Sequence, residues 1–495
     1  MSWDVLIDEP SLAALLPADY AHFARPVKEG LVVFLSGLPT AIQQQILAEQ
    51  ATLPAAASVS ERLGVLARAC PVLHKLGQVL ARDGRLAAEL RDQLRPLESL
   101  PPQVTLESIE AILAREFGPL ERRGITLLAP AIAEASVAVV IPFWEAGNRL
   151  PHGGVLKILK PGIQERLELE LELLGRVGTH FDERCEELSI PQLDYRDTFE
   201  QVRIKLHCEI QLDQEQRHLR EAAAFYAEDV DVQIPAVLDH CTPRVTAMER
   251  IVGEKITDHR LDAVADKRQL AALVTRALLA ETVFSRASRA MFHSDPHAGN
   301  LLYTHDGRLA ILDWSLVGHL GEAERIALGQ IVLGAVTLDA ERIVAVLEEL
   351  GERRQANRPV LHRIVDDWLR RIRRGQVPGL TWVVGLLDEA THSAQLRVGA
   401  DMMLFRRSLL MLEGVVGELG AGEFRIEDVL LGEFVRHFGR EWVGRWFSLP
   451  TSRACATRLS NADLAETLLG LPLAAARFWQ AEWLDVLRKH KSAMC

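Results

Sequence analysis

The sequence contains little cysteine and no C-x-x-C pair. Its six cysteines are scattered over 495 residues, at Cys70, Cys185, Cys208, Cys241, Cys455 and Cys495. A disulfide framework needs several paired cysteines in a small chain, and a zinc site needs closely spaced ligands. The spacing therefore argues against both and favours reduced thiols in a cytoplasmic protein.

Long hydrophobic runs are also missing. No stretch approaches the roughly 18 uninterrupted apolar residues that a membrane-spanning helix needs, although 48% of the residues are hydrophobic. The opening residues, MSWDVLIDEP, lack the apolar core of a signal peptide, so we expect a cytoplasmic protein. With 56 basic against 68 acidic residues and a net charge of -12, nucleic acid is not an expected partner.

Two common phosphate-binding loops are absent as well. Neither G-x-G-x-x-G nor a P-loop ending in G-K-[ST] precedes the apolar strand around Lys157. In their place stands the segment 131–136, AIAEAS. Its small side chains would let backbone amides approach a phosphate, and a tight turn between strands is the alternative.

The most informative segment present is MFHSDPHAGNLLYTHDGRLAILDWSLVG, residues 291–318. In protein kinases, His-x-Asp followed by four residues and Asn forms the catalytic loop. The Asp accepts the proton of the attacking hydroxyl and the Asn holds magnesium. His293, Asp295 and Asn300 keep this spacing.

A second acidic residue follows at the end of an expected hairpin. The apolar runs 301–303 and 309–312 flank a His-Asp-Gly turn, which predicts a β-hairpin that ends at Asp313. A carboxylate there would be a second magnesium ligand, and the chemistry would be transfer of a γ-phosphoryl group. The alternative is that Asp295 and Asp313 are turn or cap residues and that the histidines only hydrogen-bond locally.

Phosphoryl transfer also needs a cation on the nucleotide phosphates, usually a strand lysine held by a helical glutamate. Lys157, inside the apolar run 155–159, is a lysine of this kind. Its alternative role is a strand-edge lysine whose ammonium reaches water. Lys160 is the weaker candidate, because in a strand it would point to the opposite face.

The remaining sequence is mainly helical in pattern. Helical spacing covers about 11–116, 208–227, 267–292 and most of the chain after 320, including 401–419. The alternation of the segment 166–174 also suits a strand, but its Glu and Leu residues favour a helix, which we predict there. Runs rich in β-branched residues predict strands at 136–141 and 154–159, and a further strand at 244–250.

The chain resembles the UbiB-like (AarF-domain) atypical kinases from about Ser60 to at least Gly318. The family's K-x-G-Q motif is matched by Lys75-Leu-Gly-Gln78. Its alanine-rich loop is matched by Ala133, Ala135 and Ser136, its V-A-V-K strand by 155–157, and its H-x-D-P-H-x-G-N loop by 293–300.

The resemblance implies a role for each matched position. On the nucleotide we expect Ala135, Ser136, Lys157 and Glu249, the last touching adenine. For catalysis and the metal we expect Asp295 as the acid of the catalytic loop, Glu221 as the ion-pair partner of Lys157, Glu215 as the first position of the E-x-D motif, and Asn300 and Asp313 as magnesium ligands. Lys75 and Gln78 would come from a helix laid across the place of a protein substrate.

The implied fold class is α+β, a two-lobed protein-kinase-like fold. We expect a helical extension with the K-x-G-Q motif over 1–115, an N-lobe over 116–250, a C-lobe over 251–345 and a helical region over 346–495. The implied activity is Mg²⁺-dependent ATP binding and hydrolysis or phosphoryl transfer, linked to quinone, isoprenoid or other lipid metabolism. The expected partners are a nucleotide and a lipid or isoprenoid-like small molecule.

Several positions depart from the family pattern. Asp313-Trp-Ser replaces Asp-Phe-Gly, Arg217 replaces the acid of E-x-D, and Ala138-Val139 replace the usual Gly-Gln. Many members carry C-terminal membrane helices, but the segment 464–495 is polar and contains Pro472. We therefore expect any membrane contact to be peripheral.

Two other functions remain open. Small-molecule phosphotransferases of the aminoglycoside and choline kinase type also resemble the segment from His293 to Trp314 and carry Asp-Trp, but they would not be expected to carry the K-x-G-Q motif. A nucleotide-binding pseudokinase scaffold is the other, suggested by Arg217 and Ser315.

Overall fold

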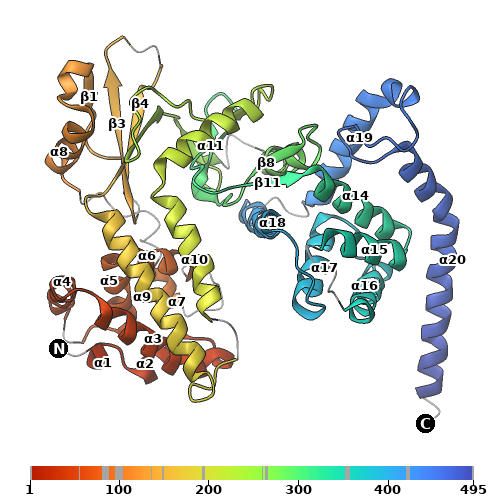
Figure 1. Ribbon diagram of the computed structural model, residues 1–495, viewed down its shortest axis with the longest axis horizontal. Helices are drawn as coiled ribbons and strands as arrows, with labels where there is room; N and C mark the ends of the chain where they lie inside the picture. The colour runs from red at the N-terminus through yellow and green to blue at the C-terminus, as the bar shows by residue number, and fades with distance from the viewer. Residues whose placement is uncertain are drawn as a thin grey trace. The chain divides into compact units, whose positions relative to one another are not determined.

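The computed structural model describes residues 3–54, 56–80, 88–94, 104–134, 136–147, 150–191, 195–258, 260–261, 266–351, 357–419 and 424–492. Contacts divide the chain into two compact units (Figure 1). The first contains Met1–Arg220 and Pro235–Ile251, and the second contains Glu221–Ile234 and Val252–Cys495. The finer division into four parts remains a prediction.

The first unit combines a helical part with an antiparallel sheet. Its helices are α1 (Trp3–Leu6), α2 (Glu9–Leu15), α3 (Ala24–Gly37), α4 (Thr40–Ala51), α5 (Val59–Ala69), α6 (Pro71–Leu80), α7 (Ala88–Leu94), α8 (Leu106–Phe117), α9 (Ile163–Arg184) and α10 (Tyr195–Glu209). Helix α11 (Leu212–Phe225) begins in this unit and ends in the second. The strands are β1 (Ile125–Leu127), β2 (Ala133–Glu134), β3 (Ala138–Glu145), β4 (Gly154–Leu159) and β6 (Val245–Glu249).

The helical part is built on close packing between α3 and α9. A Cβ added at Gly37 of α3 would lie 2.3 Å from Cδ2 of Leu173 in α9, so only glycine permits this approach. Leu173 itself is 2% exposed and belongs to a core that includes Phe34 and Leu35 of α3. The segment 166–174, whose alternation also suited a strand, is helical as predicted, because its leucines pack into this core.

The sheet has the order β1-β3-β4-β6, with β2 added on β3, and every pairing is antiparallel. Helix α8 packs Ile109 and Leu113 against Leu156 and Ile158 of β4. Side chains alternate between the two faces of a strand, so Lys157 points away from α8. The opposite face of the sheet therefore presents the candidate phosphate-binding lysine.

The second unit contains two small sheets and the C-terminal helices. The strands are β5 (Val232–Gln233), β7 (Gly253–Lys255), β8 (Arg289–His293), β9 (Leu301–Thr304), β10 (Leu309–Ile311) and β11 (Val317–Gly321). The helices are α12 (Lys267–Thr275), α13 (Glu281–Val283), α14 (Glu322–Val336), α15 (Ala340–Leu350), α16 (Arg358–Arg373), α17 (Leu380–Ser393), α18 (Ala400–Glu418), α19 (Ile426–Trp446) and α20 (Asn461–Ser492).

The predicted hairpin is confirmed, since β9 and β10 pair antiparallel across a turn in which Gly307 has a φ of 84°. The prediction of a continuous helix over 267–292 is wrong at its end. After α12, a π-helical stretch (Arg276–Ala280) and α13, the chain becomes strand β8, which pairs with β11. Long-range pairing with a strand almost 30 residues later overrides the local helical pattern.

The C-terminal helices are tied to the turn before β8 by buried arginines. Arg458 donates to the carbonyls of Arg286 and Ala287, and Arg325 donates to those of Ser285 and Ala287. Burial, and secondarily the neighbouring Arg458, lower the pKa of Arg325 to about 10. Within the described part of the chain, no helix has the length and apolarity to cross a membrane.

Candidate functional site

In the first unit, Lys157 forms a close ion pair with a buried glutamate. Its Nζ lies 2.6 Å from Oε1 of Glu215, whose side chain is 1% exposed. The adjacent Gln216 donates to the carbonyl of Thr242 at 2.9 Å and to the hydroxyl of Thr246 at 3.1 Å, on and beside β6. Gln216 thereby fixes the start of α11 against the sheet, with Glu215 facing β4.

The predicted pairing of Lys157 with Glu221 is wrong. Glu221 instead accepts a hydrogen bond from Nε2 of His319, at 2.6 Å within the second unit. Six residues on a helix correspond to about 600°, which separates two side chains by about 120° around the axis. Glu215 and Glu221 therefore face different directions, and Glu215 holds the lysine.

The alanine-rich segment is contacted by Lys160, the weaker of the two candidate lysines in the sequence. Nζ of Lys160 lies 2.7 Å from Oε1 of Glu134, at the end of β2. Ser136 follows with 7% exposure, and Ala135 lies outside the described residues. Lys160 therefore ties the end of β4 to this segment, so its role differs from that of Lys157.

The K-x-G-Q motif lies on α6. Nζ of Lys75 is 2.5 Å from Oε1 of Glu209, the last residue of α10, and both side chains are mostly buried. The motif lysine is thus held by the residue that ends the helix before α11. Gln78 is on the same helix, and its side chain lies outside the described part.

Glu249 is the last residue of β6, opposite Gly154 of β4. Its backbone N–H donates to the carbonyl of Ala236 at 2.8 Å, and its carboxylate accepts from the N–H of Ala236 at 3.3 Å. This double contact defines where the strand ends. The contact of Glu249 with adenine stays a prediction.

In the second unit, His293 joins the two candidate metal-binding segments. Its Nε2 donates to the carbonyls of Leu312 at 3.1 Å and Asp313 at 2.9 Å, while its Nδ1 accepts from the N–H of Asp295 at 3.1 Å. The three contacts require a neutral ring with the proton on Nε2. Burial lowers the pKa of His293 and supports the neutral form.

The loop after β8 holds Asn300 in a defined orientation. Its side-chain Nδ2 donates to the backbone carbonyl of Asp295 at 3.3 Å, and the residue is 8% exposed. With the amide nitrogen facing the loop, the amide oxygen is the group that Asn300 offers to a ligand. The side chain of Asp295 is 14% exposed.

Asp313 has a left-handed backbone, with a φ of 51°. Asn and Asp tolerate this conformation better than other non-glycine residues. Its Oδ1 accepts from the N–H of Ser315 at 3.2 Å. Trp314 is fully buried, donates to the carbonyl of Ile311 at 3.0 Å and packs edge-on against the ring of His293.

The amide oxygen of Asn300 and the carboxylate of Asp313 form a donor set that fits Mg²⁺. Magnesium takes hard oxygen ligands, usually one or two from the protein, with phosphate and water for the rest. No group of three or more His, Cys, Asp or Glu side chains gathers as a metal cluster in the part of the chain that the structure describes.

Helix α18 supplies residues that the sequence analysis missed. Ser408 donates to the carbonyl of His293 at 2.8 Å, and Asp401 accepts from the N–H of His319 at 3.3 Å. Nη2 of Arg407 lies 3.6 Å from Oδ1 of Asp295. These residues follow the catalytic loop by about 100 positions, and no local pattern signals the contact.

Comparisons with known proteins show which family the chain is similar to. The model of the ABC1 atypical kinase-like domain matches residues 97–347, just over half of the chain. A probable protein kinase UbiB from Xanthomonas oryzae is 25% identical, aligned over 70% of this chain and 64% of its own length. The chloroplastic ACTIVITY OF BC1 COMPLEX KINASE 3 from Arabidopsis thaliana is 27% identical over 56% of this chain and 38% of its own length.

Two further similarities are to a bacterial protein and to a solved structure. An uncharacterized Clostridium pasteurianum protein, from the 5′ region of hydrogenase 1, is 23% identical over 73% of this chain and 67% of its own length. The structure of Mycobacterium tuberculosis Rv3197 with erythromycin has a TM-score of 0.46 and 18% identity, covering 76% of this chain and 87% of that one.

Proposed function

The chain belongs to the family of ABC1 atypical kinase-like domains, and on this premise we propose that it binds ATP with Mg²⁺ and transfers or hydrolyses the γ-phosphoryl group. The family match establishes the UbiB-like family and the α+β kinase-like fold class predicted from sequence. The nucleotide, the metal and the reaction belong to the proposal.

The observation that carries the proposal is the bonding of His293. One neutral imidazole joins the loop of Asp295 and Asn300 to the backbone of Asp313. A catalytic base and two magnesium ligands must keep fixed positions if a phosphoryl group is to be transferred. A set of unrelated turn residues would not need a buried imidazole whose two ring nitrogens bond to that loop and that segment.

Each candidate residue has a defined task in the proposed reaction. Lys157, with its ammonium held by Glu215, binds phosphate oxygens of the nucleotide. Asn300 and Asp313 hold Mg²⁺, which when bound neutralises charge on the phosphates. Asp295 accepts the proton of the attacking hydroxyl or water.

The acceptor is proposed from the K-x-G-Q resemblance. Lys75 is mostly buried and paired with Glu209. We propose that α6 disfavours protein substrates, and that the reaction serves quinone, isoprenoid or other lipid metabolism in the cytoplasm. A lipid or isoprenoid-like small molecule would then stimulate ATP turnover more than a protein or peptide does.

Phosphate release from ATP tests the proposed activity. Asp313→Asn removes a charge from the metal site without straining the backbone, because Asn also adopts the left-handed conformation. We expect turnover to fall at least about 100-fold. Asp306→Asn is the matched control, since Asp306 lies in the turn of the same hairpin and its carboxylate accepts from Thr304 and Arg308. Equal turnover in both variants would contradict the assignment of Asp313.

We further propose that peripheral contact with lipid, expected from sequence, occurs through α19. Its outer face exposes half or more of each large apolar side chain among Leu431, Val435, Trp442, Val443 and Trp446, followed by Phe447 at 88%. At about 100° per residue, Leu431, Val435, Trp442 and Trp446 fall within about 60° of the helix circumference. Such a stripe is typical of helices that lie in a membrane interface.

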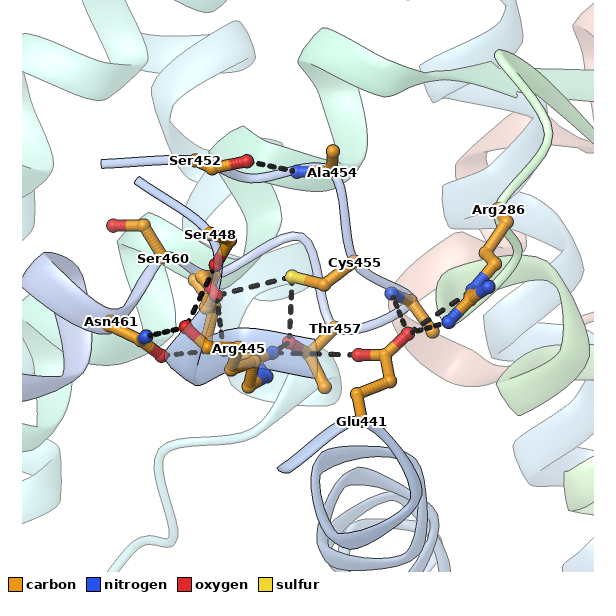
Figure 2. A network of polar contacts seen from close by, with 12 residues as sticks. Arg286, Glu441, Arg445, Ser448, Ser452, Ala454, Cys455, Thr457, Ser460 and Asn461 are labelled. Atoms are coloured by element: carbon orange, nitrogen blue, oxygen red, sulfur yellow. Dashed lines mark hydrogen bonds and ion pairs between the residues drawn. The ribbon is translucent and has the colours of Figure 1, made fainter. Parts of the chain in front are cut away.

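The charged side chains of α19 also differ between its inner and outer faces. Glu441 faces inward, where it accepts from Arg286 and from the N–H of Ala456, and Arg445 donates to the carbonyl of Leu459 (Figure 2). These contacts fix the rotation of the helix. Arg436 and Arg440 are exposed beside the apolar stripe, so the outer face favours anionic lipid although the protein is acidic overall.

A further inference from the structure

Helix α18 is fixed on strands β8 and β11 by three separate contacts. Ser408 donates to the carbonyl of His293, Asp401 accepts from the N–H of His319, and the ring of Phe405 packs edge-on against Phe292 at 5.4 Å. The three side chains span two turns of the helix. The backbone of Arg407, between Phe405 and Ser408, is therefore held in place.

The side chain of Arg407 reaches the catalytic loop from this fixed position. Its Nη2 lies 3.6 Å from Oδ1 of Asp295, and 40% of the side chain is exposed. This distance is longer than that of a hydrogen-bonded arginine–carboxylate pair. The guanidinium therefore lies beside the candidate acid while much of its surface stays open to a ligand.

The catalytic loop itself brings no positive charge. Its residues from Asp295 to Asn300 are Asp-Pro-His-Ala-Gly-Asn, without lysine or arginine. Phosphoryl transfer spreads negative charge over the oxygens of the migrating group, and an arginine in that position accelerates transfer strongly. The site thus has the carboxylate of Asp295 and one metal ligand in this loop, a second metal ligand at Asp313 after β10, and a cation supplied from a distant helix.

We propose that Arg407 is a catalytic residue that binds the oxygens of the γ-phosphoryl group during transfer. This inference rests on the proposed function. In the step, the oxygen of water or of an alcohol forms a bond to the γ-phosphorus, and the bond from that phosphorus to the β,γ-bridging oxygen breaks. The electron pair of the broken bond leaves with ADP, and the proton of the attacking hydroxyl goes to Asp295. Arg407 stabilises the charge on the three remaining oxygens.

A purely structural role for Arg407 makes a different prediction. If the guanidinium only holds Asp295 in its ionised form, its removal makes that carboxylate harder to ionise. The acid side of the pH–rate profile would then move to higher pH, and the rate would recover there. A residue that binds the phosphoryl group lowers the rate at every pH.

The experiment compares Arg407→Gln with Arg406→Gln in the full chain. Arg406 is the neighbour on the same helix and pairs with Asp388 of α17 at 3.0 Å. We expect Arg407→Gln to lower kcat for ATP at least about 100-fold across pH 6 to 9, and Arg406→Gln to keep it within about threefold. The Kd for ATP with Mg²⁺ should change less than about threefold in both variants, because the contact forms in the transition state.

Binding of ADP with aluminium fluoride gives a readout independent of turnover, because the complex imitates the planar phosphoryl group. We expect Arg407→Gln to weaken this binding by the same factor as kcat, with Arg407→Lys restoring part of it. Unchanged affinity for the analogue, or full recovery of the rate at high pH, would overturn the proposal. A wild-type protein that fails to bind ATP would instead contradict the proposed function itself.

Discussion

Two lysines in and just after β4 form ion pairs with different carboxylates. Lys157 contacts Glu215 of α11, whereas Lys160 contacts Glu134 at the end of β2. A lysine kept in place by a buried helical glutamate is suited to bind phosphate, because its position does not depend on the ligand. These two ion pairs distinguish Lys157 from Lys160. From the sequence, the two lysines differ only in the face of the strand to which each would point.

We predict that Lys157→Met weakens ATP binding at least about tenfold, since it removes the phosphate-binding charge, and that Lys160→Met weakens it less than about threefold. The single variant removes the ammonium that lies 2.6 Å from the buried carboxylate of Glu215, and we expect the loss of this ion pair to cost about 3 kcal/mol of folding free energy. Lys157→Met combined with Glu215→Gln should recover stability but not binding. Calorimetric titration and urea unfolding measure both effects. Recovery of ATP affinity in the double variant would contradict the role of Lys157.

His293 makes the stability of the second unit sensitive to acid. Burial lowers its pKa from the usual 6.5, and a proton on Nδ1 would displace the N–H of Asp295. The unfolded chain takes up this proton near pH 6.5 and the folded chain only at lower pH. The stabilising contribution is therefore complete above pH 6.5 and is lost as the pH falls below it.

Urea unfolding at pH 7.5 and 5.5 tests this prediction. Between these two pH values the free energy of unfolding of the wild-type protein should fall by up to about 1.4 kcal/mol more than that of His293→Gln, because glutamine cannot take up the proton. The difference between the two proteins cancels the effects of other histidines, including His437. An equal loss in both would show that the imidazole of His293 is not held neutral.

The packing of helix α3 against helix α9 depends on Gly37. Gly37→Ala should destabilise the protein by about 1–3 kcal/mol, because its Cβ would meet the buried Leu173. Gly175→Ala in α9 is the matched control, since its Cβ meets nothing within 4 Å. It should stabilise the helix by up to about 1 kcal/mol. Thermal unfolding measures both, and a neutral Gly37→Ala would contradict the packing described.

Elements with a strong local pattern could be predicted from the sequence. The hairpin of β9 and β10 has a matching Asp-Gly turn, and the Glu and Leu residues of α9 have high helix propensity. The prediction of helix through β8 was wrong, because its pairing with β11 is a long-range interaction. For the same reason the sequence analysis assigned Glu221, and not Glu215, as the partner of Lys157. It also missed Arg407, whose contact with Asp295 joins residues far apart in the chain.

At the scale of the whole molecule, the exposed face of α19 predicts lipid binding. We expect the protein to sediment with phosphatidylcholine vesicles that contain 30% phosphatidylglycerol and to bind pure phosphatidylcholine at least about tenfold more weakly. Trp442→Ala with Trp446→Ala should abolish sedimentation, and Arg436→Gln with Arg440→Gln should remove its dependence on anionic lipid. Trp144→Ala is the control, since Trp144 is also exposed but lies on β3.

The proposed lipid contact fails if no vesicle sediments the protein. It also fails if the two tryptophan substitutions instead abolish a concentration-dependent dimer, since α19 would then be covered by a second copy. Light scattering without lipid separates these two outcomes.

We propose above that the chain holds ATP through Mg²⁺ at Asn300 and Asp313. Calorimetric titration of ATP into the full chain, with and without Mg²⁺, tests this proposal, beside Asp313→Asn and the control Asp306→Asn. We expect ATP binding that depends on Mg²⁺, that is lost in Asp313→Asn and that is kept in Asp306→Asn. Absence of ATP binding by the wild-type protein, or equal binding by Asp313→Asn, would contradict it.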